Sequence, residues 1–348
     1  MRSNSKRILI VNQNWMGDVL FSTPAIRALR KAHPESFIGC LVPSRCREVL
    51  ENNPYLNEVL VYDDRAPVFS PGFWRLVRGL RKRAFDQAFF FHRSRTKTLS
   101  ALLGGIRQRY GYGSEGDGRF LTKRIAPPEK ELHKIDFFLN LLEQLDVPPD
   151  GRVPDFFPKA GSDAALEQLF KSSGIDPEIP YVVLHTGGNW ELKRWPADYF
   201  VRWIQLFLSE FSWSVILCGT SSEKGISDAI AANFSPRQVV SLCGRSSLDV
   251  LALLLGRAKF LLSNDSGPIH LASTQRTPVL GLYGPTSQRL SGPVSNGSVR
   301  ILQKDVGCQV PCYFRSCDTR VCMEWITPEE VFQETLKLSV EIGASERA

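Results

Sequence analysis

The sequence has no long apolar run, and this absence argues against a helical membrane span. Its 348 residues are 43% hydrophobic and 23% charged, which is ordinary for a globular protein. No stretch approaches the roughly 18 consecutive apolar residues that cross a bilayer. The basic N-terminus (Arg2, Lys6 and Arg7) precedes an apolar run that ends before Asn12, which is too short for the core of a signal peptide. We therefore expect a cytoplasmic protein.

The motifs of several enzyme classes are also missing. No G-x-S-x-G elbow occurs, which disfavours a Ser-His-Asp hydrolase. Asp63-Asp64 is not a D-x-D metal motif, so a metal-dependent sugar transferase would lack its usual ligand. No zinc-finger or RNA-binding signature accompanies the basic residues, which counts against a nucleic-acid partner.

Acidic residues are in the minority only in the first half of the chain. Residues 1–150 contain 24 Lys and Arg against 16 Asp and Glu, and the remainder contains 19 against 20, so the whole positive excess lies in the first half. One explanation is an anionic partner such as a lipid headgroup or a phosphorylated glycan, and the other is a solvated basic face. The densest basic stretch comprises Arg75, Arg78, Arg81, Lys82, Arg83, Arg93, Arg95, Lys97, Arg107 and Arg109.

The chain begins with a predicted strand, loop and helix, the first step of an open α/β sheet. Residues 8–11 (ILIV) are too few for a helix and rich in β-branched side chains, so they predict a buried strand. From Val19 onward apolar residues recur at helical spacing. The intervening loop would lie at the carboxyl end of the strand, where such sheets bind ligands. Gly17-Asp18 in this loop is a candidate for chemistry, and the alternative is that Asp18 only caps the helix.

Strands and helices alternate along the chain, which predicts mostly parallel, doubly wound Rossmann-like sheets. Residues 146–155 (DVPPDGRVPD) are rich in Pro, Gly and Asp and indicate a domain boundary. We expect domains at 1–155 and 156–326, facing each other across a cleft as in the glycosyltransferase B architecture. A helix over 327–348, with Thr327 as N-cap and Glu330 at N3, is available to cross back to the first domain. The predicted strands are 8–11, 37–42, 59–62, 87–91 and a possible edge strand 107–111, then 181–185, 214–218, 239–242, 260–263 and 279–283.

Two loops that follow predicted strands of the second domain have the composition of a phosphate site. Thr186-Gly187-Gly188 combines a hydroxyl with glycines that let backbone N–H groups approach an anion, and Lys193 adds charge nearby. The alternative is an ordinary glycine turn with a surface lysine. Neither this loop nor the next one matches a Walker P-loop or a G-x-G-x-x-G fingerprint. A nucleotide-diphosphate ligand without a redox cofactor therefore fits best.

The second loop, residues 263–270 (SNDSGPIH), joins a buried strand to a helix whose N-terminus favours anions. Asp265 can accept hydrogen bonds from a ribose or sugar hydroxyl, and Ser266 and Gly267 can donate to a phosphate. His270 lies one turn into the helix, where it faces either the ligand or the core.

Four of the eight cysteines are close together in the sequence, at C-x3-C-x4-C-x4-C spacing. Such a cluster could hold zinc or iron–sulfur, but it lacks the paired C-x2-C knuckles of well-known sites. Reduced thiols that pack in or stabilise a loop are the alternative that we prefer. The cluster comprises Cys308, Cys312, Cys317 and Cys322, and Cys40, Cys46, Cys218 and Cys243 are expected to be buried thiols.

Taken together, these motifs resemble glycosyltransferase family 9, the lipopolysaccharide heptosyltransferases, and most closely the heptosyltransferase II type. The resemblance spans nearly the whole chain. It rests on residues 12–30 (NQNWMGDVLFSTPAIRALR), 53–59 (NPYLNEV), 185–196 (HTGGNWELKRWP), 264–272 (NDSGPIHLA) and the cysteine stretch that ends at Cys322.

The resemblance implies an ADP-heptose donor in the second domain and a phosphorylated lipid acceptor on the basic first domain. Asp18 matches the family's general base, with Gly17 beside it, and Lys193 would neutralise the diphosphate. Around the diphosphate the resemblance places Thr186, Gly187, Ser266 and Gly267. Asp265 and Glu223 would contact hydroxyls of the sugar or ribose, and His270 would lie at the same loop.

We expect an inverting transfer of heptose to the lipopolysaccharide inner core, with no tightly bound cofactor and no obligatory metal. The protein would be a monomer that works at the inner face of the cytoplasmic membrane as a peripheral protein. Two alternatives remain open: a transferase or epimerase on the same fold that uses another nucleotide sugar, and a non-catalytic protein that binds a nucleotide sugar or glycan.

Overall fold

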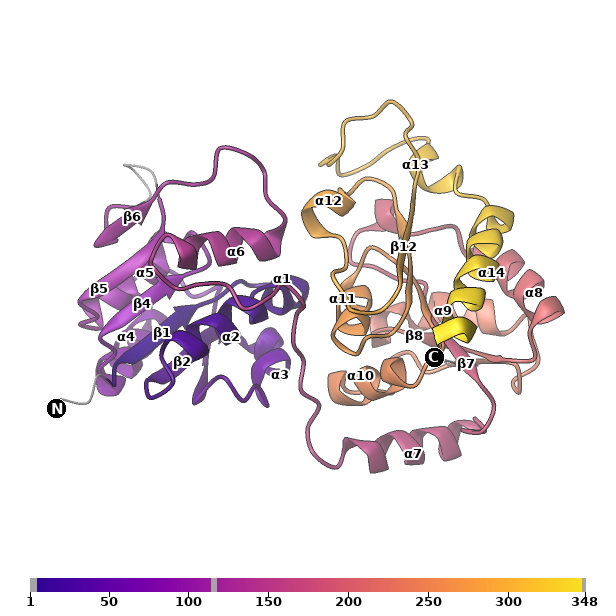
Figure 1. Cartoon of the computed structure of the whole chain (residues 1–348), viewed down its shortest axis with the longest axis horizontal. Coiled ribbons are helices and arrows are strands. Elements are labelled where there is room, and N and C mark those ends of the chain that lie inside the picture. The colour runs from indigo at the N-terminus through magenta and orange to yellow at the C-terminus, as the bar shows by residue number, and fades with distance from the viewer. Residues whose placement is uncertain (1–4, 114–117, 346–348) are drawn as a thin grey trace. The chain divides into compact units, whose positions relative to one another are not determined.

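The computed structural model describes residues 5–113 and 118–345 and divides the chain into two compact units. The units are Met1–Phe157 and Pro158–Ala348, and each contains one six-stranded sheet flanked by helices (Figure 1). Within the described residues, every helix is too short or too polar to cross a bilayer.

The sheet of the first unit has the strand order β3-β2-β1-β4-β5-β6, and all its strands are parallel. β2 and β3 follow outward on one side of β1, and β4, β5 and β6 follow outward on its other side. The sheet therefore has its topological switch point between β1 and β4, where ligands bind in doubly wound folds. The strands are β1 (Arg7–Val11), β2 (Phe37–Pro43), β3 (Glu58–Tyr62), β4 (Gln87–Phe90), β5 (Gln108–Tyr112) and β6 (Lys123–Ile125).

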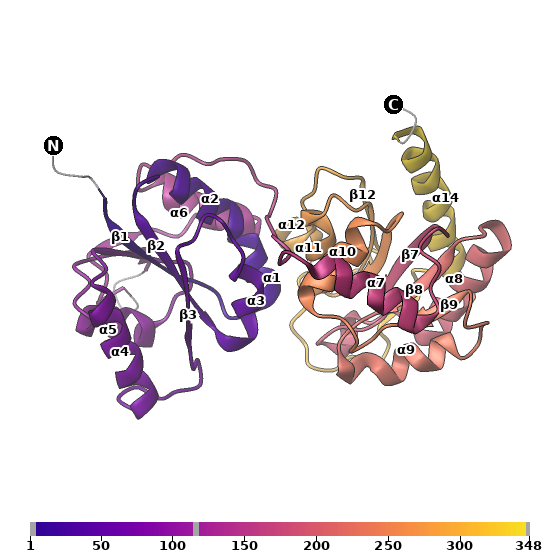
Figure 2. The same ribbon diagram turned by 90° about the horizontal axis from the view of Figure 1, so that it is seen from below.

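Helices cover both faces of this sheet. In Figure 2 the strands β1 to β3 lie between α4 (Pro71–Arg83) and α5 (Arg95–Leu103) on one side and α2 (Thr23–Ala32) and α6 (Lys134–Glu143) on the other. Apolar residues from β1, β4 and α4, among them Leu9, Phe90 and Leu80, form a buried cluster on one face. The remaining helices are α1 (Met16–Phe21), the 3₁₀ helix η1 (Ser44–Cys46) and α3 (Arg47–Leu50).

The second unit repeats this plan with the parallel strand order β12-β11-β10-β7-β8-β9. Its switch point lies between β7 and β10. The strands are β7 (Tyr181–His185), β8 (Ser214–Cys218), β9 (Val239–Ser241), β10 (Leu261–Asn264), β11 (Val279–Tyr283) and β12 (Val299–Gln303). The helices are α7 (Ser162–Ser173), η2 (Glu191–Lys193), α8 (Ala197–Glu210), η3 (Ser221–Glu223), α9 (Lys224–Ala231), α10 (Leu248–Gly256), α11 (Gly267–Thr274), α12 (Gln288–Ser291), α13 (Val321–Glu324) and α14 (Pro328–Ser345).

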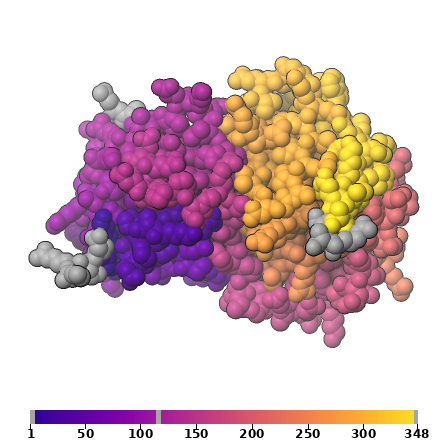
Figure 3. All heavy atoms as spheres, viewed as in Figure 1, coloured from indigo at the N-terminus to yellow at the C-terminus, as the bar shows by residue number. Residues whose placement is uncertain are grey.

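Aromatic packing holds the C-terminal helix on the second unit. Trp203 and Phe207 of α8 are fully buried, and their rings stack with centroids 4.9 Å apart. The indole N–H of Trp203 donates to Thr335 Oγ1 of α14 at 3.2 Å. As predicted, Thr327 caps α14, because its Oγ1 accepts from the backbone N–H of Glu330 at 3.3 Å. α14 lies at the surface of this unit, in yellow in Figure 3; its crossing to the first unit stays a prediction.

The predicted strands agree with the observed ones to within one or two residues, but both sheets have a sixth strand that the sequence did not indicate. β6 has only three residues, and β12 is half-buried along its whole length. Both are edge strands, so neither contains the buried apolar run that identifies a central strand. The strand predicted at 107–111 (β5) is not an edge strand, because β6 pairs with it on the outer side.

Candidate functional site

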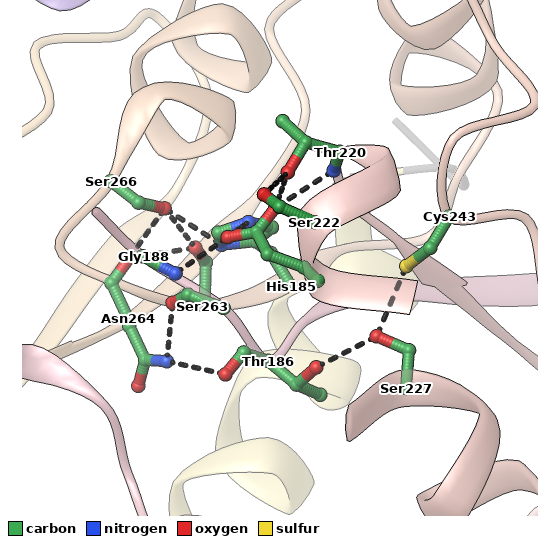
Figure 4. Close-up of polar contacts among 12 residues, drawn as sticks. His185, Thr186, Gly188, Thr220, Ser222, Ser227, Cys243, Ser263, Asn264 and Ser266 are labelled. Carbon is green, nitrogen blue, oxygen red and sulfur yellow. Dashed lines mark hydrogen bonds and ion pairs between the residues drawn. The ribbon is translucent and has the colours of Figure 1, made fainter. Parts of the chain in front are cut away.

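The predicted phosphate loops of the second unit meet at the switch point of its sheet. Residues 186–188 follow β7, residues 265–266 follow β10, and Glu223 ends the short helix η3 after β8. Because β7 lies between β8 and β10, the carboxyl ends of all three strands bring these loops together. The polar contacts among them are drawn in Figure 4.

Glu223 joins two of these loops. Its Oε1 accepts from the backbone N–H of Gly188 at 2.7 Å, and its Oε2 accepts from the backbone N–H and the hydroxyl of Thr220 at 2.7 and 2.8 Å. His185 Nε2 lies 3.3 Å from Oε1. Burial raises the pKa of this carboxyl, but the contacts with His185 and Thr220 outweigh burial and lower the pKa to about 2. Both oxygens of Glu223 are thus already bound by the protein.

Only glycine fits at position 187. A Cβ atom there would lie 1.9 Å from Glu223 Oε1, far inside the contact distance. The next residue, Gly188, has a φ of +150°, a conformation that other residues rarely adopt. The glycines therefore let the chain pass close to the Glu223 carboxylate, and the backbone here has a fixed shape.

His185 and Asn264 link the loops after β7 and β10. His185 Nδ1 and the Ser266 hydroxyl are 2.8 Å apart, so one imidazole connects Ser266 to Glu223. The Asn264 amide donates to the carbonyls of Thr186 and Gly187 at 3.2 and 2.9 Å (Figure 4). Its oxygen accepts from the backbone N–H of Trp195 at 3.0 Å. Neither His185 nor Asn264 was predicted as a site residue, although each adjoins one.

Lys193 and Asp265 form an ion pair, with Nζ and Oδ2 2.9 Å apart. His270, in the first turn of α11, places Nε2 4.0 Å from the other oxygen. Burial raises the pKa of Asp265, but the charges of Lys193 and His270 outweigh burial and lower the pKa below its ordinary value. The Lys193 side chain is 20% exposed, so its ammonium has access to a ligand while it holds Asp265.

The two remaining predicted residues, Thr186 and Gly267, differ in their surroundings: one contacts other side chains and the other has open space beside it. The Thr186 hydroxyl lies 3.1 Å from the hydroxyl of Ser227, which also accepts from Cys243 Sγ at 3.0 Å. Gly267 is the first residue of α11, and apart from its chain neighbours and the backbone of its own helix, no described atom lies within 4 Å of where a Cβ would be. The N-terminus of α11 has no side-chain cap and follows Asp265, the partner of Lys193, so it can bind an anion such as a diphosphate.

In the first unit, Asp18 does not cap a helix. The helix α1 begins at Met16 with Trp15 as N-cap and no side-chain cap, so Asp18 and its neighbour Gly17 lie in the first turn. The capping interpretation is therefore wrong. Lys134, at the start of α6, donates to Asp18 Oδ1 at 2.5 Å. The carboxylate is 18% exposed at the carboxyl end of β1.

The basic stretch of the first unit is only partly a surface feature. Arg83 pairs with Glu58 of β3, and Arg109 is buried and donates to backbone carbonyls, including that of Phe120. Lys97 is also buried. Exposed basic side chains remain at Arg75, Arg78, Arg81, Lys82, Arg93, Arg95 and Arg107.

Four cysteines are buried, as predicted, and the sequence cluster lies at or near the surface. Cys40, Cys46, Cys218 and Cys243 are buried free thiols. Cys308 and Cys317 are exposed, and Cys312 and Cys322 are half-buried. Across residues 5–113 and 118–345, no group of three or more Cys, His, Asp or Glu side chains is arranged to hold a metal ion.

Known structures share this architecture. An Escherichia coli ADP-heptose lipopolysaccharide heptosyltransferase II is 22% identical with a TM-score of 0.80, covering 98% of this chain and 100% of its own. A family 9 glycosyltransferase from Veillonella parvula is also 22% identical, with a TM-score of 0.85, covering 98% of this chain and 99% of its own. The fold is therefore that of the glycosyltransferase B enzymes.

The sequence comparisons define the family. Residues 73–318, more than half of the chain, match the model of glycosyltransferase family 9 (heptosyltransferase). Lipopolysaccharide heptosyltransferase 2 of Escherichia coli K12 is 26% identical over 302 residues, which cover 83% of this chain and 86% of the relative. This chain belongs to glycosyltransferase family 9 and is a glycosyltransferase.

Proposed function

We propose that this enzyme transfers a heptose from ADP-L-glycero-D-manno-heptose to the inner core of lipopolysaccharide, on an acceptor of the heptosyl-Kdo-lipid A type. The observation that carries the proposal is the ion pair of Lys193 and Asp265 beside the N-terminus of α11, which has no side-chain cap. A lysine, a helix N-terminus and a carboxylate are the groups that bind a diphosphate and a sugar hydroxyl. The name of the E. coli heptosyltransferase II structure includes ADP-heptose, which supports this donor.

In this proposal the second unit binds the donor. Lys193 neutralises the diphosphate, and Ser266 and the backbone N–H of Gly267 donate to it. Asp265 accepts from a hydroxyl of the ribose or the sugar, with His270 beside it. Thr186 and Gly187 lie beside the diphosphate. Glu223, expected to contact a sugar or ribose hydroxyl, instead has both oxygens bound by Gly188 and Thr220 and stabilises the β7 loop.

The first unit binds the acceptor in this proposal, and Asp18 is the general base. The acceptor hydroxyl loses its proton to Asp18 as its oxygen attacks the anomeric carbon, and the bond from that carbon to the phosphate oxygen breaks with inversion. ADP leaves with the electron pair, and its charge is stabilised by Lys193 and the α11 N-terminus without an obligatory metal. Lys134 orients the Asp18 carboxylate before the acceptor binds.

The exposed arginines of α4 suit an anionic membrane surface, so we place the enzyme at the inner face of the cytoplasmic membrane as a peripheral protein. The enzyme acts as a monomer in this proposal.

The test is to incubate the purified enzyme with ADP-heptose and a panel of truncated core acceptors and to analyse the products by mass spectrometry. The expected product is the acceptor plus one heptose. Asp18→Asn, which keeps the shape of the side chain, should lower kcat by about 10²–10⁴-fold, the usual contribution of a general base. Unchanged turnover would refute the role of Asp18. Preference for UDP over ADP in competition, or donor hydrolysis that no acceptor accelerates, would refute the proposed reaction.

A further inference from the structure

A buried histidine lies between a carboxylate and a hydroxyl of the candidate site, and both of its ring nitrogens are in contact. His185, the last residue of β7, is 3% exposed. Its Nε2 lies 3.3 Å from Glu223 Oε1, and its Nδ1 lies 2.8 Å from the Ser266 hydroxyl. Such a ring is either neutral with one N–H or an imidazolium with two. The two forms direct the proton of the Ser266 hydroxyl differently.

The Glu223 carboxylate determines which ring nitrogen keeps its proton. With a pKa of about 2 it is ionised near neutral pH, so it can only accept hydrogen bonds. Its Oε1 already accepts from the backbone N–H of Gly188. His185 Nε2 must therefore carry a proton and donate to Glu223. A neutral His185 then has a bare Nδ1, which can only accept.

While His185 is neutral, the Ser266 hydroxyl has no proton left for a ligand. Its single proton goes to the bare Nδ1, 2.8 Å away. The other acceptors near it are the carbonyl of Asn264 at 3.1 Å and the hydroxyl of Ser263 at 3.2 Å (Figure 4). Ser263 donates its own proton to the same carbonyl at 2.7 Å. To a phosphate at the N-terminus of α11, Ser266 would present only lone pairs, which repel a phosphate oxygen.

Protonation of His185 reverses this hydrogen bond. Nδ1–H then donates to the Ser266 oxygen, and the hydroxyl proton can turn toward a phosphate oxygen. The bond formed is Nδ1–H, with a proton taken from solvent. Glu223 compensates the imidazolium on one side and the phosphate does so on the other. Two anions around one buried ring favour its charged form more than the carboxylate alone.

The thiols near His185 do not titrate in its place. Cys218 of β8 pairs with His185 in the register of the two strands, and burial raises the pKa of its thiol well above the ordinary value. Burial also raises the pKa of Cys243, which donates to Ser227. Both thiols therefore keep their protons near neutral pH, and neither can take up another.

The remaining charged groups of the site are Lys193, Asp265 and His270. Burial raises the pKa of Asp265, but the charges of Lys193 and His270 lower it overall, so Asp265 is ionised. Lys193 already carries its positive charge in the ion pair with Asp265. His270 is the other imidazole at the site, so an experiment must distinguish its protonation from that of His185.

We propose that His185 is a positioning residue that takes up a proton when the diphosphate binds, so that Ser266 can donate to it. The imidazolium strengthens Ser266 as a donor, and its charge lies behind the phosphate oxygen on which charge builds as the bond to the sugar breaks. His185 itself does not touch the donor. This inference rests on the proposed function, because it assumes that a diphosphate binds beside Ser266.

Nitrogen-15 NMR of histidine-labelled protein tests the proposal directly, since the chain has only five histidines. At pH 8 the His185 ring of the enzyme without ligand should be the neutral Nε2–H tautomer, and saturating ADP should convert it to the doubly protonated ring. His185→Gln and His270→Gln assign the signals of the two site rings. If neither variant folds, the wild-type spectra still decide, because one of the five rings must gain a proton. A ring that is protonated at Nδ1 alone, or that ADP leaves unchanged, would overturn the proposal.

Calorimetry in buffers of different ionisation enthalpy counts the protons that are taken up with ADP. At pH 8 the phosphates of ADP are fully ionised, so the proton must enter the protein. The wild type and His33→Gln, a change at the end of α2, should take up close to one proton, and His185→Gln should take up none. From pH 7.5 to 8.5 the affinity of the wild type should fall by about tenfold, because binding consumes a proton, and that of His185→Gln should stay constant. Proton uptake by His185→Gln would assign the proton to another group and contradict the proposal.

Ser266→Ala removes the hydroxyl between the ring and the phosphate. This variant should bind ADP without proton uptake, and adding His185→Gln should weaken binding no further, because the two residues act through one hydrogen bond. Losses that add independently would contradict this connection. A merely structural role of His185 would lower the Tm and leave the pH dependence of binding intact.

Heptose transfer is measured separately from proton uptake. If ADP binds with proton uptake but no heptose is transferred, the proposed function alone fails. If heptose is transferred but ADP binding takes up no proton, this inference alone fails. A wild type that does not bind ADP would overturn both.

Discussion

Glu223 accepts a hydrogen bond from the backbone N–H of Gly188 at 2.7 Å, and this contact joins the loops that follow β7 and β8. A buried carboxylate that stays ionised thus determines the shape of a loop rich in glycine. Because this loop follows β7 beside the proposed diphosphate site, the contact connects stability to donor affinity.

Gly187→Ala should destabilise the second unit and weaken donor binding. The added Cβ would meet Glu223 Oε1 at 1.9 Å, so either the carboxylate or the β7 loop must move. Overpacking of this kind costs about 1–3 kcal/mol, measured by denaturant unfolding. Gly225→Ala is the control, since Gly225 lies in α9 with open space around it, and it should be neutral or slightly stabilising. Equal stability of the two variants would contradict the close approach.

Glu223→Gln should change the dependence of stability on pH. The pKa of Glu223 falls from 4.5 to about 2 on folding, so its contribution to stability is complete above pH 4.5 and is lost as pH falls toward 2. This contribution is on the order of 3 kcal/mol. The difference in Tm between the wild type and Glu223→Gln should therefore be largest near neutral pH and shrink between pH 4.5 and 2. Glu210→Gln, at an exposed position, should follow the wild type throughout.

Lys193→Met should weaken ADP binding by about 10–100-fold, because the diphosphate loses its cation. The same change leaves Asp265 buried without its lysine partner, so stability should fall as well. Lys193→Met combined with Asp265→Asn should recover the stability but not the affinity for ADP. Calorimetric binding and thermal unfolding of the single and double variants measure both effects. Recovery of ADP binding in the double variant would exclude a direct contact between Lys193 and the diphosphate.

Arg78→Glu with Arg81→Glu should reduce binding to vesicles that contain anionic lipid, by about 1 kcal/mol per reversed residue, and should leave ADP binding unchanged. Arg83 is omitted because it pairs with Glu58, and its reversal would also disturb the fold. Lys171→Glu with Arg237→Glu makes the same charge change on exposed positions of the second unit. If both double variants lose vesicle binding equally, net charge and not this face attracts the membrane.

Local pattern was sufficient to predict most of the fold. Short β-branched runs identified the central strands, because these strands are buried on both faces and must be apolar throughout. The edge strands β6 and β12 were not predicted, because a partly exposed edge strand need not contain a continuous apolar run. From the sequence, Asp18 could either take part in catalysis or cap a helix. The structure excludes capping, because α1 begins at Met16 and its N-cap is Trp15.

The α/β class, the positions of most strands along the chain and the two loops with phosphate-binding composition could be predicted, because each depends on residues close together in the sequence. Which polar groups contact one another depends on the tertiary structure. His185 lies between Glu223 and Ser266, and Lys193 pairs with Asp265 seventy-two positions away, because parallel strands bring their carboxyl ends to one edge. The same geometry buries Lys97 among neutral groups. In the sequence it had been only one basic residue among ten, since charge can be counted from a sequence but burial cannot.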